Sequence, residues 1–262
     1  MDLELRGRKA LITGASKGIG AAIARTLAGE GCDLVLTARD GAALDALCTD
    51  LAQQHGVTAT AIAADLREPG AVVLLAQAAG DADILVNNAG DIPGGSLAAI
   101  DEARWRKAWG LKVMGTIDLS RAFYALMKER GSGVIVNVIG AAGERMDANY
   151  IAGSSGNAAL YAFTRALGGA SMRDGIRVVG VSPGAVATER IRQLMRSAAE
   201  ARFGDGDRHE ELMQGLPAGR AADPREVADL VAFAASARAS YISGTVITID
   251  GGLCANPSAS FG

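Results

Sequence analysis

The chain has 262 residues, 49% of them hydrophobic, and a formal net charge of −3. This composition supports a buried core without a visible break, so we expect a single domain over residues 1–262. Scattered cations exclude a nucleic-acid groove, and the lack of an apolar run of about 20 residues excludes a membrane span.

Three cysteines, Cys32, Cys48 and Cys254, lie far apart and fit neither a disulfide framework nor a metal site. Residues 1–6 include acidic side chains and lack the apolar core of a signal peptide. We therefore expect reduced thiols, a cytoplasmic protein and no bound metal.

The first predicted strand, residues 9–12, leads into a glycine-rich turn and then a helical pattern over residues 21–28. Glycine lets the backbone approach a ligand closely, and the first turn of a helix attracts anions. The order strand, turn, helix predicts a cradle for the pyrophosphate of a dinucleotide. The turn reads Thr13-Gly14-Ala15-Ser16-Lys17-Gly18-Ile19-Gly20.

Apolar runs of strand length recur along the chain and alternate with stretches of helical spacing. Strands that are apolar throughout indicate a parallel sheet covered on both faces. The prediction is an α/β protein with a doubly wound, seven-stranded parallel sheet, the Rossmann fold. The expected strands are residues 10–13, 34–37, 59–63, 84–87, 134–139, 178–182 and 246–249.

The longest helical pattern covers residues 102–129. It places Trp105, Trp109, Val113 and Ile117 near one side of the helix. This spacing predicts a stripe that packs against the core.

Six consecutive strands are followed by residues suited to ligand binding. In an open parallel sheet, ligands bind at the carboxyl ends of the strands. These segments should therefore meet at one edge of the sheet. They are residues 14–20, Arg39, Asp65, residues 87–90, 140–150 and 183–188.

Four motifs in this order make the chain resemble the short-chain dehydrogenases/reductases over almost its whole length. They are Thr13-Gly14-x-x-x-Gly18-x-Gly20, Asn87-Asn88-Ala89-Gly90, Pro183-Gly184-x-x-x-Thr188 and Ser243-Gly244 with Asp250-Gly251-Gly252. The resemblance implies a nicotinamide dinucleotide cofactor, a small-molecule substrate, a mobile substrate lid at about 189–220, and a homodimer or homotetramer.

The resemblance also implies which residues bind the cofactor. Residues of the glycine turn would contact the pyrophosphate, and the residues after the third and fourth strands would flank the adenine and ribose. The turn after the sixth strand would hold the nicotinamide amide. The full set is Gly14, Ser16, Lys17, Gly18, Ile19, Gly20, Arg39, Asp65, Leu66, Asn88, Ala89, Gly90, Lys112, Pro183, Gly184, Val186 and Thr188.

Charge after the second strand favours NADP(H) over NAD(H). A carboxylate there would accept from a free ribose 2′-hydroxyl, whereas an arginine suits a 2′-phosphate. Arg39 stands at this place, and Lys17 lies in the glycine turn. Asp40 argues for the opposite choice, unless its carboxylate caps the following helix.

The usual catalytic residues of the family are absent. Resemblance assigns the places of its asparagine, serine, tyrosine and lysine to Lys112, Gly140, Gly153 and Asn157. A tyrosine normally gives the proton and needs help, because its free pKa is about 10. None of the four positions keeps the family's residue.

Lys112, Tyr150 and Asn157 are the candidates to replace them. A desolvated Lys112 could donate a proton near neutral pH; the alternative is an ion pair with Glu144 or Asp147, or a stem that reaches water. Tyr150 could reach the site only if its loop folds back; otherwise its phenol lines a pocket or an interface. Asn157 can hydrogen-bond the ribose hydroxyls.

Three functions follow from these residues. The first is an NADP(H)-dependent oxidoreductase that interconverts a carbonyl and an alcohol with a non-standard active site. The second is an NADP(H)-binding sensor or scaffold with little catalysis, and the third is a redox-neutral lyase or hydratase. The residues do not identify the substrate, because fold alone does not fix function.

Overall fold

A seven-stranded parallel sheet forms the centre of the computed structural model, which describes residues 1–256; residues 257–262 of the expected domain lie outside the described residues. The strand order β3-β2-β1-β4-β5-β6-β7 places the crossover point between β1 and β4. The predicted doubly wound sheet is confirmed. The strands are β1 Lys9–Thr13, β2 Asp33–Ala38, β3 Ala59–Ala63, β4 Ile84–Asn87, β5 Gly133–Val138, β6 Ile176–Pro183 and β7 Thr245–Ile249.

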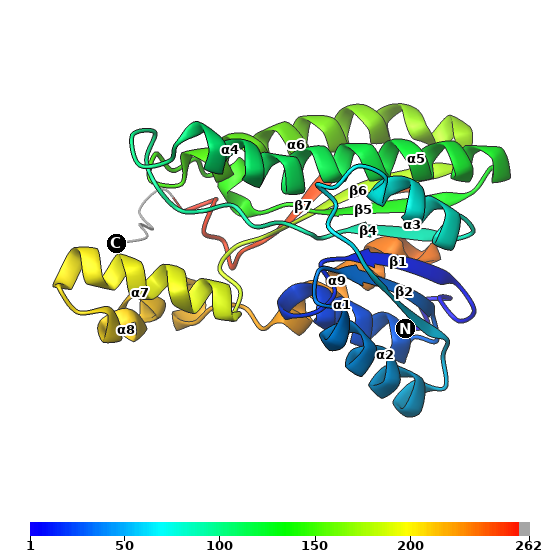
Figure 1. The fold of residues 1–262 in the computed structure, drawn as a ribbon, viewed down its shortest axis with the longest axis horizontal. Coiled ribbons are helices and arrows are strands. Elements are labelled where there is room, and N and C mark those ends of the chain that lie inside the picture. The colour runs from blue at the N-terminus through cyan, green and yellow to red at the C-terminus, as the bar shows by residue number, and fades with distance from the viewer. Residues whose placement is uncertain (257–262) are drawn as a thin grey trace.

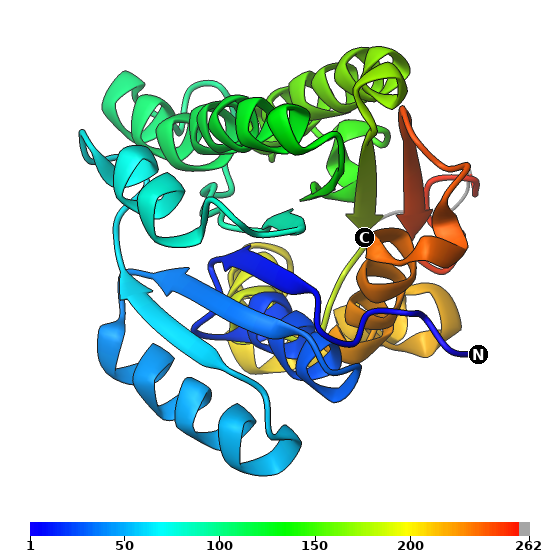
Figure 2. The same cartoon turned by 90° about the vertical axis from the view of Figure 1, so that its right-hand side faces the viewer.

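Helices cover both faces of the sheet (Figure 1). One layer holds α1 Gly18–Gly29, α2 Gly41–His55 and α9 Pro224–Ala235. The other layer holds α3 Ala71–Ala79, α4 Glu102–Trp109, α5 Gly115–Arg130 and α6 Ile151–Ser171. A further pair, α7 Glu189–Phe203 and α8 His209–Gln214, projects beyond the end of the sheet, and Figure 2 shows the two layers from the side.

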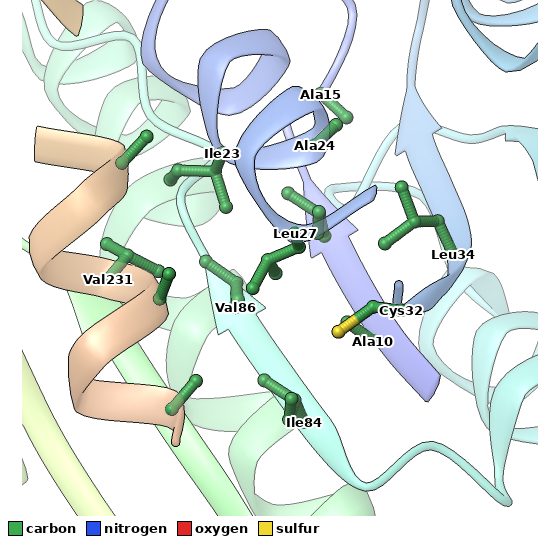
Figure 3. Close-up of a cluster of buried hydrophobic side chains, with 14 of the residues drawn as sticks. Ala10, Ala15, Ile23, Ala24, Leu27, Cys32, Leu34, Ile84, Val86 and Val231 are labelled. Carbon is green, nitrogen blue, oxygen red and sulfur yellow. The ribbon is translucent and has the colours of Figure 1, made fainter. Parts of the chain in front are cut away.

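The core between the sheet and α1 and α9 consists of aliphatic side chains that are withdrawn from water (Figure 3). Ile23 and Leu27 of α1 meet Ile84 and Val86 of β4, and Val231 reaches them from α9. Each fully buried Leu or Ile contributes about 1.5–3 kcal/mol. This packing fixes α1 on the sheet and so holds the glycine turn that precedes it.

Strand β6 begins two residues earlier than predicted. The charged Arg177 interrupts the apolar pattern from which the strand was predicted, but its side chain is buried in the sheet like its neighbours. Its guanidinium donates to the carbonyls of Ala234, Ala235, Ser236 and Ile242 at 2.7 to 3.4 Å. These include the last carbonyls of α9, where a cation also opposes the negative end of the helix dipole. Arg177 is therefore a capping residue for α9.

Arg177→Met should lower the free energy of unfolding by roughly 3 kcal/mol, because it leaves several buried carbonyls without donors. Urea denaturation of the wild type and the variant measures this difference. Arg173→Met, an exposed change close by, is the control and should stay within about 0.5 kcal/mol. Equal stability of Arg177→Met and wild type would show that the cap contributes nothing.

The helix predicted over residues 102–129 is not continuous. A π-helical turn, Gly110–Met114, separates α4 from α5. The expected stripe nevertheless packs against buried side chains: Trp105 against one cluster, and Trp109, Val113 and Ile117 within another. The outer faces of Trp105 and Trp109 line an apolar groove with Leu97 and Met114. Such a π-turn changes the direction of the side chains that it carries, often at functional sites.

The described residues contain no helix long and apolar enough to cross a membrane. They also contain no group of three or more His, Cys, Asp or Glu side chains placed to hold a metal ion. Cys32, Cys48 and Cys254 are all free thiols.

Candidate active site

The glycine turn and the Asn87–Gly90 segment are held together by hydrogen bonds. Asn88 Nδ2 donates to the carbonyls of Thr13 and Gly14, at 3.0 and 3.2 Å, and Thr13 Oγ1 accepts from the amides of Asn88 and Ala89. Gly14 has a φ of +65°, and a Cβ on Gly20 would lie 2.2 Å from the Gly14 carbonyl oxygen. At these two positions only glycine fits, because the neighbouring backbone and Asn88 leave no room for a Cβ.

Helix α1 begins at this turn with its N-terminus free. Lys17 is the N-cap residue, no side chain caps the helix, and its first turn contains no acidic residue. Ser16 and Ile19 flank the turn, half-buried. Free N–H groups and the positive end of a helix dipole suit a phosphate. The geometry fits the expected pyrophosphate cradle.

Of the charged residues that follow β2 and β3, Asp40 and Asp65 have partners within the protein, whereas Arg39 is exposed. The Asp65 carboxylate is paired with Arg67, which lowers its pKa to about 2, and Arg39 adds to this shift. Arg39 is exposed, and forms no salt bridge within residues 1–256. The Asp40 carboxylate accepts from the amide of Ala43 at 3.0 Å and so caps α2. The capping alternative for Asp40 is confirmed.

The turn after β6 lies close to the glycine turn. A Cβ on Gly18 would lie 3.3 Å from the Thr188 methyl carbon, and Thr188 is the N-cap of α7. Val186 forms an isolated bridge with Ala222, and a Cβ on Gly184 would meet Asp250 at 2.9 Å. The expected segments after β1, β4 and β6 thus meet at one edge.

Lys112 lies on the π-turn and is buried, with 7% of its surface exposed. Its Nζ donates to the carbonyl of Val138, 2.6 Å away, and a Cβ on Gly90 would lie 3.2 Å from this Nζ. The expected alternatives for Lys112 are wrong: it forms no ion pair with Glu144 or Asp147, and its stem does not reach water. Burial lowers the pKa of Lys112 to about 7, and the charge of Arg190 adds to the shift.

Gly140 and Asn157 lie against each other at the end of β5. Gly140 has a φ of +144°, and a Cβ there would lie 2.8 Å from Asn157 Nδ2, so a serine would be strained. Asn157 is 4% exposed, and its Oδ1 has no hydrogen-bond partner among the described residues. A buried acceptor without a donor is unusual and suits a ligand hydroxyl.

Tyr150 folds back over Gly153. A Cβ on Gly153 would lie 2.0 Å from Tyr150 Cε1 and 2.2 Å from Cζ, so the phenol occupies the space where a tyrosine at 153 would begin. Tyr150 stands immediately before α6, and its backbone forms a bridge with Gly95. The Tyr150 ring therefore lies beside position 153, and its role at the site stays a prediction.

Arg190, in the first turn of α7, is a site residue that the sequence did not single out. Its guanidinium contacts Tyr150 Oη at 3.2 Å, Asp91 Oδ1 at 3.3 Å and the carbonyl of Ile92 at 2.5 Å. The sequence offered one indication of its role: Arg190 lies two residues after Thr188, within the expected lid. Burial raises the pKa of Tyr150, and Arg190 opposes this shift.

The sheet order, the open glycine turn and the buried groups at the strand ends define a nucleotide-binding protein of the Rossmann type. Comparison with known proteins gives the family. Residues 14–254 match the family model described as enoyl-(acyl carrier protein) reductase. Galactitol 2-dehydrogenase (L-tagatose-forming) of Cereibacter sphaeroides is 34% identical over 250 residues, 95% of each chain.

Two solved structures show the same fold with different cofactors. L-Sorbose reductase of Gluconobacter frateurii, complexed with NADPH and L-sorbose, has a TM-score of 0.89 at 30% identity, over 98% of this chain and 100% of that chain. 7α-Hydroxysteroid dehydrogenase, complexed with NADH and 7-oxo glycochenodeoxycholic acid, has a TM-score of 0.84 at 29% identity, over 96% of each. The chain belongs to the short-chain dehydrogenase/reductase family. It is an oxidoreductase of alcohol and carbonyl substrates that uses a nicotinamide cofactor.

Proposed function

We propose that the protein is an NADP(H)-dependent oxidoreductase that interconverts a carbonyl and an alcohol without the family's usual catalytic residues. The observation that carries this proposal is the pair of proton-bearing groups at the strand ends. Tyr150 fills the space above Gly153, and Lys112 is buried between Gly90 and the Val138 carbonyl. Burial lowers the pKa of Lys112 to about 7 and raises the pKa of Tyr150, so Tyr150 carries its proton at neutral pH.

The residues at this edge fit a dinucleotide. The open turn at Gly14 and Gly20 and the free first turn of α1 would take the pyrophosphate, and Asn157 Oδ1 would accept from a ribose hydroxyl. Arg39 and Lys17 would bind the 2′-phosphate of NADP(H), since the Asp40 carboxylate is committed to the cap of α2.

The chemistry needs one hydride and one proton. The bound cofactor supplies or accepts the hydride, and the protein orients the substrate and transfers the proton. In the direction of reduction, Tyr150 or Lys112 gives its proton to the carbonyl oxygen, and solvent later restores it. Burial keeps the Tyr150 phenol protonated at neutral pH, which suits an acid rather than a base.

We also propose that α7 and α8 act as a substrate lid over this edge and that the protein forms a homodimer or homotetramer. The lid proposal is supported by Arg190, which joins α7 to the segment after β4. The oligomer proposal is supported by the apolar groove at Trp105 and Trp109. A cytoplasmic location stays a prediction from the free cysteines.

Consumption of NADPH with a panel of ketones tests the proposed activity. The panel is L-sorbose, 7-oxo glycochenodeoxycholic acid and a 3-oxoacyl thioester, with alcohol formation measured by mass spectrometry. At least one ketone should be reduced. Tyr150→Phe should lower kcat by at least about tenfold, because it removes one of the two proton donors. Tyr241→Phe, at a side chain that is 97% exposed, is the matched control.

Two outcomes would contradict the proposal. Tight NADPH binding without reduction of any panel member favours the sensor or scaffold. Product formed from a substrate without net loss of NADPH favours the lyase or hydratase.

A further inference from the structure

Arg190 joins three parts of the fold that meet at the site. It is carried by α7, it forms an ion pair with Asp91 and a hydrogen bond with the Ile92 carbonyl after β4, and it contacts Tyr150 before α6. No other arginine within the described residues contacts the hydroxyl of Tyr150. The contact of α7 with the proton-bearing side of the site therefore depends on this side chain.

The direction of the hydrogen bond between Arg190 and Tyr150 is fixed by chemistry. A guanidinium has only donors, so the Tyr150 oxygen must accept from Arg190 Nη2. The hydroxyl proton of Tyr150 then points elsewhere, and within residues 1–256 no acceptor takes it. The proton is left available to a substrate oxygen.

The surroundings of Tyr150 contain few other charges. Tyr150 packs against an apolar cluster that consists of Ile92, Ile100, Ala108 and Ala152. Asp91 is the only carboxylate of the described residues that shifts the titration of Tyr150, and it is itself paired with Arg190. The nearby Asp147 carboxylate accepts from the amide of Asn149. Arg190 is thus the positive charge beside this phenol.

We propose that Arg190 is a positioning residue for proton transfer: it holds the Tyr150 hydroxyl with its proton free and places a positive charge beside this phenol. This inference rests on the proposed function and deepens it. A nearby cation stabilises the phenolate that remains after Tyr150 gives its proton to the carbonyl oxygen, and it disfavours the ammonium form of Lys112. Both effects favour transfer of a proton from Tyr150 or Lys112 to the substrate.

Arg190→Met, which keeps the length of the stem and removes the charge, tests the proposal in two measurements that need no substrate. In protein labelled with [¹³Cε]lysine, the NMR titration midpoint of Lys112 should rise by at least about half a pH unit. In protein labelled with [¹³Cζ]tyrosine, the Tyr150 signal at neutral pH should move, because its oxygen loses a donor. Tyr150→Phe and Lys112→Met identify the two signals.

Arg190→Lys should restore part of each effect, since it returns a positive charge. Arg192→Met is the matched control: Arg192 lies on the same helix, is exposed and pairs with Glu189, so both signals should stay in place. Circular dichroism confirms that each variant is folded. Unchanged Lys112 and Tyr150 signals in Arg190→Met, or equal changes in Arg192→Met, would overturn the proposal.

A third measurement separates this inference from the proposed function. With any ketone that the wild type reduces, Arg190→Met should lower kcat by at least about tenfold and leave the Kd of NADPH unchanged. Shifted signals with unchanged kcat would overturn the role of Arg190 in proton transfer. Shifted signals in a protein that reduces no ketone would refute the proposed activity and leave the charge coupling intact.

Discussion

Lys112→Met should unfold at a higher urea concentration than the wild type at about pH 6, although it removes a hydrogen bond. The pKa of Lys112 is about 7 in the folded protein, against an ordinary value of 10.5. Below about pH 7 both the folded and the unfolded chain carry the proton, so the full cost of burying the ammonium is present. Between about pH 7 and pH 10.5 the unfolded chain binds more protons than the folded protein, so the free energy of unfolding of the wild type rises with pH.

Lys112→Met should raise the free energy of unfolding by about 2–4 kcal/mol at pH 6, and this difference from the wild type should shrink as the pH approaches 10. The same variant should lose at least about tenfold in kcat, since a candidate donor is gone. Lys107→Met, at an exposed position on the preceding helix, should change neither quantity. A stability difference that does not vary with pH would show that the Lys112 amine is not desolvated in solution.

Arg39→Ala should weaken NADPH binding by roughly tenfold to a hundredfold and leave NADH binding nearly unchanged. The reason is the loss of charge-assisted hydrogen bonds to the 2′-phosphate, each of about 1.5–3 kcal/mol. Fluorescence titration of the reduced cofactors gives both dissociation constants.

Two further results sharpen the test of Arg39. The wild-type preference for NADPH should fall as salt rises, because an exposed arginine is screened. Arg25→Ala is the control, since Arg25 pairs with Asp50 and is not expected to touch the cofactor. Equal losses for NADPH and NADH would remove the assignment of Arg39 to the phosphate.

The sheet could be predicted because its strands are apolar throughout, as buried parallel strands are. All seven expected strands are present, with ends shifted by at most two residues. The largest shift is at β6, where Arg177 breaks the apolar pattern. Its charge is solvated by carbonyls from α9 and the segment before β7, contacts that no local pattern shows.

The site was predictable only in part. Residues at the strand ends follow from the topology, so the neighbourhood of the glycine turn, Asn88 and Thr188 could be expected. The π-turn that aims Lys112 has no clear sequence pattern, because it differs from an α-helix by one residue in its hydrogen bonding. Arg190 was missed for a different reason: its contacts with Tyr150 and Asp91 join segments about 40 and 99 residues apart.

The departures from the family's pattern accommodate one another in the structure. The positive φ of Gly140 and the Asn157 amide beside it leave no room for a serine, and the Tyr150 ring excludes a tyrosine at 153. A serine at 140 would be strained by the positive φ, and a tyrosine at 153 would require the Tyr150 ring to move.

Transfer of deuterium from NADPH that carries deuterium at both C4 positions of the nicotinamide tests the central claim most directly. With a ketone reduced by the wild-type protein, the product alcohol should carry one deuterium at the former carbonyl carbon, and Tyr150→Phe or Lys112→Met should slow its formation. An unlabelled product, or bound NADPH that transfers no deuterium to any ketone of the panel, would contradict the account.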